Sequence, residues 1–140
     1  MPPPNPSSPQ EPRAKRVLFV DDDEGLREIV SLYLERRGYF VETAGDGAEG
    51  LQKLTETASD PAVAFDLLIT DVKMPRLDGI GLVRALRDHE LRLPVIVCSS
   101  AFTKTSLDEL RSLSVAAILP KSTMVDSLPE VVEKVIYAIG

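Results

Sequence analysis

Cysteine is almost absent from this chain of 140 residues, which holds one, Cys98. One cysteine cannot form a disulfide within the chain, and its position in an apolar run indicates a core residue. No stretch reaches the roughly 18 apolar residues of a membrane span, and the N-terminus lacks the apolar segment of a secretory signal. We therefore expect a cytoplasmic protein that does not contact a membrane.

Basic residues are fewer than acidic ones: the chain has 16 lysine and arginine residues and 22 aspartate and glutamate residues, which gives a formal net charge of −6. This balance argues against nonspecific nucleic-acid binding, which depends on cationic contacts with phosphates. An acidic pocket for a cation fits it better. Histidine is equally scarce, and His89 lies in a charged segment that indicates a surface residue rather than a phosphoryl relay.

The length allows one well-packed core. Residues 1–13 contain six prolines among small polar residues, a composition that buries too little apolar surface to offset its ordering entropy. We predict a disordered, proline-rich tail over residues 1–13 and one domain over residues 14–140.

Short apolar runs alternate with segments of helical periodicity from residue 16 onward. The apolar runs are residues 17–20, 40–44, 67–70, 94–98 and 115–119. The helical segments lie near residues 26–34, 48–56, 79–87, 105–113 and 128–139. This alternation predicts an α/β fold, a parallel five-stranded sheet covered by five helices on both faces and joined by right-handed crossovers.

Polar residues stand where these runs end. They are Asp21 and Asp22 after the first run, Asp71 after the third, Ser99 after the fourth and Lys121 after the fifth. Parallel α/β sheets bind ligands beyond the carboxyl ends of their strands, so we expect these side chains to share one rim. Neighbouring carboxylates repel unless a cation compensates them, and Mg²⁺ prefers oxygen ligands, often with a phosphate oxygen among them. The rim therefore predicts a phosphoryl group beside Mg²⁺, with the lysine on the phosphate side.

The residues that end the strands resemble the receiver domains of bacterial two-component response regulators. The resemblance is carried by Val20 to Asp23, by the Asp-x-x-Met-Pro-x-x-Asp-Gly element from Asp71 to Gly79, and by Ser99 and Lys121. It covers residues 15–139 and implies a flavodoxin-like, doubly wound sheet with strand order 2-1-3-4-5.

The resemblance also implies a set of metal ligands. Asp22 and Asp71 match direct Mg²⁺ ligands, Asp21 matches a ligand that acts through water, and the backbone carbonyl of Lys73 matches a further ligand. Mg²⁺ is the implied cofactor.

The same resemblance makes Asp71 the phosphoacceptor, Ser99 the hydroxyl that binds the phosphoryl group in the active state, and Lys121 the cation that pairs with the phosphoryl oxygens. The implied donor is a histidine kinase or phosphotransfer protein.

The resemblance implies a signalling role rather than turnover of a substrate. Because the sequence ends at Gly140 without an effector domain, we expect a stand-alone receiver that controls a separate effector protein or a second copy of itself.

Some positions depart from the family pattern or have structural interpretations. Ile118 stands three residues before the lysine, where receivers usually have a mobile aromatic residue, so an aromatic swing cannot be the switch.

Asp23 is expected to cap the first helix. Pro75 is expected to stiffen the loop after Asp71, and Gly79 to ease the turn into the next helix.

Other functions remain possible. A pseudo-receiver would use the fold for protein binding without phosphorylation. A phosphatase of the haloacid dehalogenase type would use Asp21 as nucleophile and Asp23 as acid, but it would leave the segment 71–79 unexplained. The glycines of residues 45–50 match the dinucleotide-binding pattern G-x-G-x-x-G, yet they follow the second predicted strand rather than the first, and we interpret them as a turn.

Overall fold

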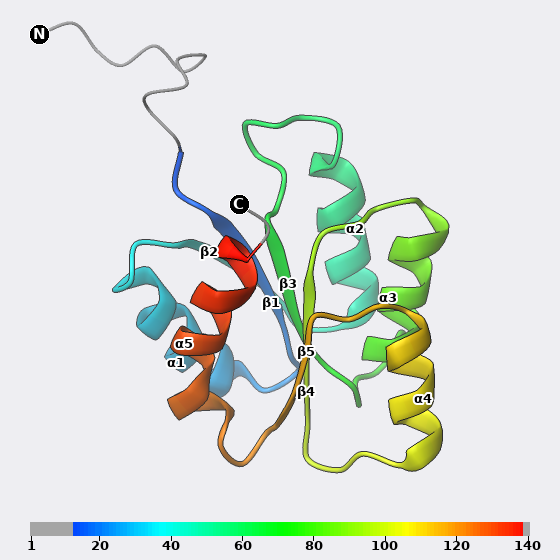
Figure 1. Ribbon diagram of the computed structural model, residues 1–140. Coiled ribbons are helices and arrows are strands. Elements are labelled where there is room, and N and C mark those ends of the chain that lie inside the picture. The colour runs from blue at the N-terminus through cyan, green and yellow to red at the C-terminus, as the bar shows by residue number, and fades with distance from the viewer. Residues whose placement is uncertain (1–12, 139–140) are drawn as a thin grey trace, which may run out of the picture.

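Five parallel strands form one sheet in the order β2-β1-β3-β4-β5, with helices on both faces (Figure 1). The computed structural model describes residues 13–138. The strands are β1 (Arg16–Val20), β2 (Phe40–Ala44), β3 (Leu67–Asp71), β4 (Val95–Ser99) and β5 (Ala117–Pro120). The helices are α1 (Glu24–Glu35), α2 (Gly47–Thr57), α3 (Gly79–Asp88), α4 (Lys104–Ser112) and α5 (Met124–Tyr137). The strand order and the two helical layers confirm the predicted fold class.

The two faces of the sheet have separate cores. Helices α1 and α5 cover one face, and α2, α3 and α4 cover the other (Figure 1). Strand β1 shows the alternation: Leu18 and Val20 pack toward α2 and α3, whereas Val17 and Phe19 pack toward α1 and α5. Burial of such a side chain stabilises the fold by about 1.5–3 kcal/mol, so both faces of the strand are apolar and the sequence shows an unbroken run.

The boundaries of β3, β4 and β5 differ from the predictions. Strands β3 and β4 each extend one residue further, so that Asp71 and Ser99 are their last residues. Strand β5 begins at Ala117 rather than at residue 115, because the Val115 amide takes part in the hydrogen bonding that ends α4. The Val115 amide donates to the Leu110 carbonyl over 3.4 Å, and Ser114 has a φ of 57°. This pattern ends a helix and delays the strand.

Helices α1 to α4, which leave the carboxyl end of the sheet, begin at capping residues. Asp23, Asp46, Asp78 and Thr103 each accept a hydrogen bond from the backbone amide three residues on. Such caps satisfy amides at the helix start that have no carbonyl partner. The predicted role of Asp23 as the cap of α1 is confirmed.

The first described residue, Arg13, is attached to the domain. Its guanidinium donates to the Asp66 carboxylate over 2.8 Å and to the Ala64 carbonyl over 3.0 Å. Residues 1–12, where most of the predicted tail falls, lie outside the described residues, so the division at residue 13 stays a prediction. In the described part of the chain, no helix is long and apolar enough to span a membrane.

Candidate functional site

The predicted site residues come together at the carboxyl end of the sheet. One carboxylate oxygen each of Asp21, Asp22 and Asp71 lies within 4.8 Å of the others. Strands β1 and β3 are direct neighbours in the sheet, with Val20 beside Thr70, so the acids that follow these residues meet. Lys121 joins them from the end of β5, where its amide donates to the Ser99 carbonyl over 2.8 Å.

Asp21 is completely buried, and its two carboxylate oxygens have different surroundings. Oδ1 accepts a hydrogen bond from the Asp23 amide over 2.9 Å. Oδ2 lies 3.0 Å from Lys121 Nζ without the geometry of a hydrogen bond, and no group in residues 13–138 donates a hydrogen bond to this buried oxygen. A buried acceptor of this kind is costly unless a cation or water satisfies it.

Asp71 and Lys121 form the closest ion pair of the rim. Lys121 Nζ donates to Asp71 Oδ2 over 2.9 Å, and the Val72 amide donates to Asp71 Oδ1 over 2.8 Å. Asp71 is 5% exposed, so its carboxylate is largely shielded from bulk solvent. Asp22 is exposed and is therefore the acid of the three that is most open to a ligand from solution.

Lys121 compensates the negative charge of the rim carboxylates only in part. Burial raises the pKa of Asp21 above its ordinary value of 3.8, and the charge of Asp71 raises it further, against the opposite effects of the Asp23 amide and of Lys121. Burial alone would lower the pKa of Lys121, but its contacts with Asp71 and Asp21 raise that pKa, so the ammonium group stays charged. Lys121 thus pairs with two of the three carboxylates, Asp21 and Asp71, and the three acids together fit a divalent cation with oxygen ligands.

Ser99 and Lys73 complete the predicted set. Ser99 is buried at the end of β4, and its hydroxyl donates to the Ala101 carbonyl over 2.9 Å. Lys73 is exposed in the loop after β3, two residues beyond Asp71. Within residues 13–138, no hydrogen bond reaches the Lys73 carbonyl, which leaves this oxygen available as a ligand. His89, as expected, is an exposed residue at the end of α3.

The glycine motif of residues 45–50 packs helix α2 against its neighbours. The Gly47 amide donates to the Leu77 carbonyl over 3.1 Å, and a Cβ atom at position 47 would lie 2.2 Å from that oxygen. A Cβ atom at Gly50 would lie 2.9 Å from Cγ2 of Val20. Close packing therefore accounts for these two glycines of the motif.

Two arginines that the sequence analysis did not single out bind residues at the carboxyl end of the sheet. Arg27 donates to the Asp21 carbonyl over 2.7 Å, and Arg76 binds the Asp46 carboxylate. Arg76 and Asp46 are thirty residues apart in the sequence, whereas Arg27 lies six residues after Asp21. In both cases, an arginine in a helix or a loop carries no pattern that indicates its partner.

The asparagine variant of Asp21 should stabilise the protein when Mg²⁺ is absent. Folding raises the pKa of Asp21, so the protonated side chain favours the folded state. This stabilisation is fully present below the ordinary pKa of the carboxyl group, and it is lost as the pH rises through the raised pKa of the folded protein. At pH 7 with EDTA, Asp21→Asn should therefore increase the free energy of unfolding in urea by about 1 kcal/mol. This gain should shrink as the pH falls toward 4.

The matched control is Asp23→Asn, since asparagine also caps helices well and should change stability by less than about 0.5 kcal/mol. An Asp21→Asn protein that is less stable than the wild type at pH 7 would contradict the electrostatic interpretation.

The chain matches one family model and several curated proteins. Residues 17–133 match the response regulator receiver domain. The chain is 40% identical over 86 residues to the alkaline phosphatase synthesis transcriptional regulatory protein PhoP of Bacillus subtilis, and 44% identical over 85 residues to the response regulator MprA of Mycobacterium ulcerans. Each match covers 61% of this chain but only 33% and 34% of those proteins, so the chain corresponds to about a third of their length.

Solved structures share the fold over nearly the whole chain. The chemotaxis protein CheY4 of Vibrio cholerae superposes with a TM-score of 0.74 at 29% identity and covers 87% of this chain and 98% of its own. A response regulator receiver protein from Pseudomonas putida gives a TM-score of 0.77 at 29% identity, over 89% of this chain and 99% of its own.

Proposed function

This chain belongs to the response regulator receiver domain family, a signalling module of two-component systems, and on that premise we propose that Asp71 accepts a phosphoryl group from a phosphohistidine. The donor is a histidine kinase or a phosphotransfer protein. The observation that carries the proposal is the arrangement of a nearly buried Asp71 within 2.9 Å of Lys121, beside the two further acids of the rim.

The proposed step is an in-line transfer to a carboxylate. An Asp71 oxygen forms the new bond to phosphorus, while the bond between phosphorus and the donor nitrogen breaks and its electron pair stays on the imidazole. Lys121 offsets the negative charge that the phosphoryl oxygens bring into the rim. The Val72 amide holds Asp71 Oδ1, which restricts rotation of the carboxylate.

Asp22, Asp71 and the Lys73 carbonyl would bind Mg²⁺ directly, and Asp21 would bind it through water. Bound there, the ion would neutralise charge on both the acids and the phosphoryl group. The unsatisfied Oδ2 of Asp21 supports this assignment, because a water bound to the ion can donate a hydrogen bond to it.

Ser99 provides a path from the rim to the surface. Its hydroxyl donates to the Ala101 carbonyl, and we propose that it turns to a phosphoryl oxygen after transfer, which releases the loop between β4 and α4. Phe102 in this loop and Ile118 in β5 are both half-buried against the core of α2, α3 and α4. The output therefore passes through loop movement to an effector protein or a second copy of the chain, without an aromatic swing at position 118.

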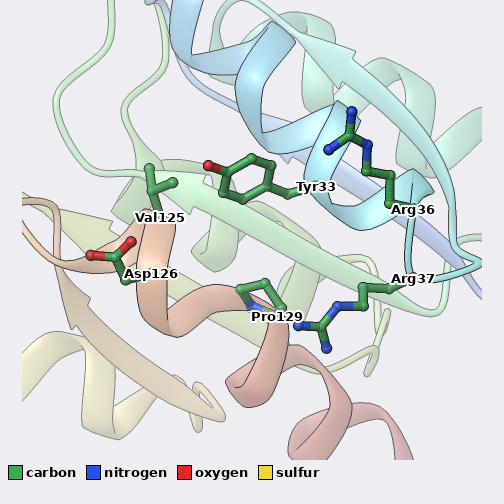
Figure 2. Close-up of a pocket in the computed structure, with 6 residues that line it drawn as sticks. All are labelled: Tyr33, Arg36, Arg37, Val125, Asp126 and Pro129. Atoms are coloured by element: carbon green, nitrogen blue, oxygen red, sulfur yellow. The ribbon is translucent and has the colours of Figure 1, made fainter.

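Helix α1 offers the donor a docking surface. It begins directly after the acids of β1 and exposes three large apolar side chains, Ile29, Leu32 and Tyr33. Exposed apolar groups that lie together mark interaction surfaces. A hollow of about 270 Å³ lies beside one of them, Tyr33, between α1 and α5 (Figure 2). Its lining residues are Tyr33, Arg36, Arg37, Val125, Asp126 and Pro129. This hollow contains none of the rim residues, which supports a role in docking rather than in transfer.

Incubation with acetyl phosphate and Mg²⁺ should add one phosphoryl group to the intact protein, as measured by mass spectrometry. Acetyl phosphate replaces the protein donor, and acetate leaves as the bond to phosphorus breaks. EDTA should suppress the addition, because the three acids then lack their cation. An unchanged mass under these conditions would favour the pseudo-receiver. Steady release of phosphate from many phosphomonoesters would favour the phosphatase.

A further inference from the structure

The loop between β3 and α3, residues 72–78, carries the carbonyl of Lys73, and its hydrogen bonds lie mainly at its two ends. The Gly79 amide donates to the Val72 carbonyl over 2.8 Å, and the Gly47 amide donates to the Leu77 carbonyl over 3.1 Å. The Leu77 amide donates to the Pro75 carbonyl over 2.8 Å, which folds the loop on itself but fastens it to nothing else. The segment 73–76 therefore depends on side chains for its position.

Arg76 provides a polar anchor for this segment. Its Nε donates to Asp46 Oδ2 over 2.9 Å, and its Nη2 contacts the same oxygen. The two side chains differ in exposure, at 71% for Arg76 and 6% for Asp46. The arginine thus reaches from the surface to a buried carboxylate thirty residues away in the sequence.

Asp46 is a fixed partner. Its Oδ1 accepts the Glu49 amide over 2.8 Å, which caps helix α2, so the carboxylate cannot move without loss of the cap. The hydrogen bond from the Glu49 amide, together with Arg76, lowers the pKa of Asp46 and keeps it charged. The ion pair therefore connects the loop to a rigid point of the fold.

The backbone of Arg76 supports the same interpretation. Its φ is 68°, in the left-handed region that residues other than glycine, asparagine and aspartate adopt rarely. Such a conformation persists where the surrounding contacts impose it. Among the described residues, the contacts that reach Arg76 from outside the loop are those with Asp46.

We propose that Arg76 and Asp46 are positioning residues for the Mg²⁺ site. Their ion pair holds the segment 73–76 and thereby fixes the position of the Lys73 carbonyl relative to Asp22 and Asp71. This inference rests on the proposed function, which assigns that carbonyl to the metal.

A double-mutant cycle on Mg²⁺ binding tests the proposal. By calorimetry on the unphosphorylated protein, Arg76→Ala and Asp46→Asn should each weaken Mg²⁺ binding about fivefold, and the double variant should be no weaker than either. Asparagine retains the cap of α2, so its effect reports the charge. The control is Arg84→Ala, because Arg84 is also an exposed arginine in an ion pair, with Glu109 of α4, and should leave the affinity unchanged.

Arg76→Gly separates positioning from stability. Glycine adopts a φ of 68° freely, so this variant should unfold in urea with EDTA at the wild-type concentration or above, yet bind Mg²⁺ several-fold more weakly. Arg76→Lys should recover part of the affinity, since it keeps the charge but not the paired donors.

Wild-type affinity in Arg76→Ala, or single effects that multiply in the double variant, would overturn the positioning role alone. A wild-type protein that neither binds Mg²⁺ nor takes up a phosphoryl group would overturn the proposed function, and this inference with it.

Discussion

Substitution of Asp71 by asparagine should reduce labelling by acetyl phosphate and Mg²⁺ by at least about a hundredfold. The amide has nearly the same size and shape as the carboxylate, and its oxygen can still accept from the Val72 amide or from Lys121, so the fold should persist. The variant lacks the anionic oxygen that attacks phosphorus. The measurement is the fraction of intact protein that carries one phosphoryl group over time.

Asp78→Asn is the matched control for this experiment. Asp78 lies seven residues further along the same loop and caps α3 by accepting from the Gly81 amide over 2.7 Å. Asparagine can make the same cap, so labelling should stay at the wild-type level. If the Asp71→Asn protein were labelled as fast as this control, the phosphoacceptor would be another residue.

Replacement of Gly79 by alanine should lower the free energy of unfolding by about 3 kcal/mol. A Cβ atom at this position would lie 2.0 Å from the Asp71 carbonyl oxygen, which is backbone and cannot rotate away. Helix α3 would have to move away from β3 and lose the hydrogen bond from the Gly79 amide to Val72. Urea unfolding measures the stability, and labelling should fall with it because the same movement displaces Asp71.

Gly25→Ala provides a control in which the same substitution has the opposite sign. Gly25 lies in the first turn of α1, and the nearest atom to an added Cβ is Asp23 Oδ1 at 3.5 Å, an ordinary contact. Alanine favours the helix, so this variant should gain about 0.5–1 kcal/mol. A Gly79→Ala protein as stable as the wild type would show that α3 does not need its close approach to β3.

The two largest predicted effects thus both involve one residue, Asp71. The Asp71 side chain is the proposed phosphoacceptor, and the Asp71 backbone oxygen is the atom against which Gly79 packs. A displacement of α3 is therefore expected to displace the proposed phosphoacceptor, Asp71. Stability and phosphoryl transfer are expected to vary together at this point, whereas Asp21→Asn should increase stability and weaken the metal site.

Several features of the fold were predictable because they depend on local pattern. A strand covered on both faces is mostly apolar, so the runs that became β1, β3 and β4 are visible in the sequence. Asp23 could be assigned as a cap from its place before a helical segment, which the structure confirms. The start of β5 was predicted wrongly, because Val115 is apolar in either role and its hydrogen bond to Leu110 has no signal in the sequence.

The sequence by itself determined which residues stand at the strand ends, and the parallel sheet then required that Asp21, Asp22, Asp71, Ser99 and Lys121 share one rim. Only the tertiary structure decided how they differ: Asp21 is buried with an unsatisfied oxygen, whereas its neighbour Asp22 is exposed. It also changed the reason for Gly79, which is close packing rather than an unusual turn, and it revealed the ion pair between Arg76 and Asp46. Burial and contacts between distant segments arise from how the elements pack, and no pattern of neighbouring residues encodes them.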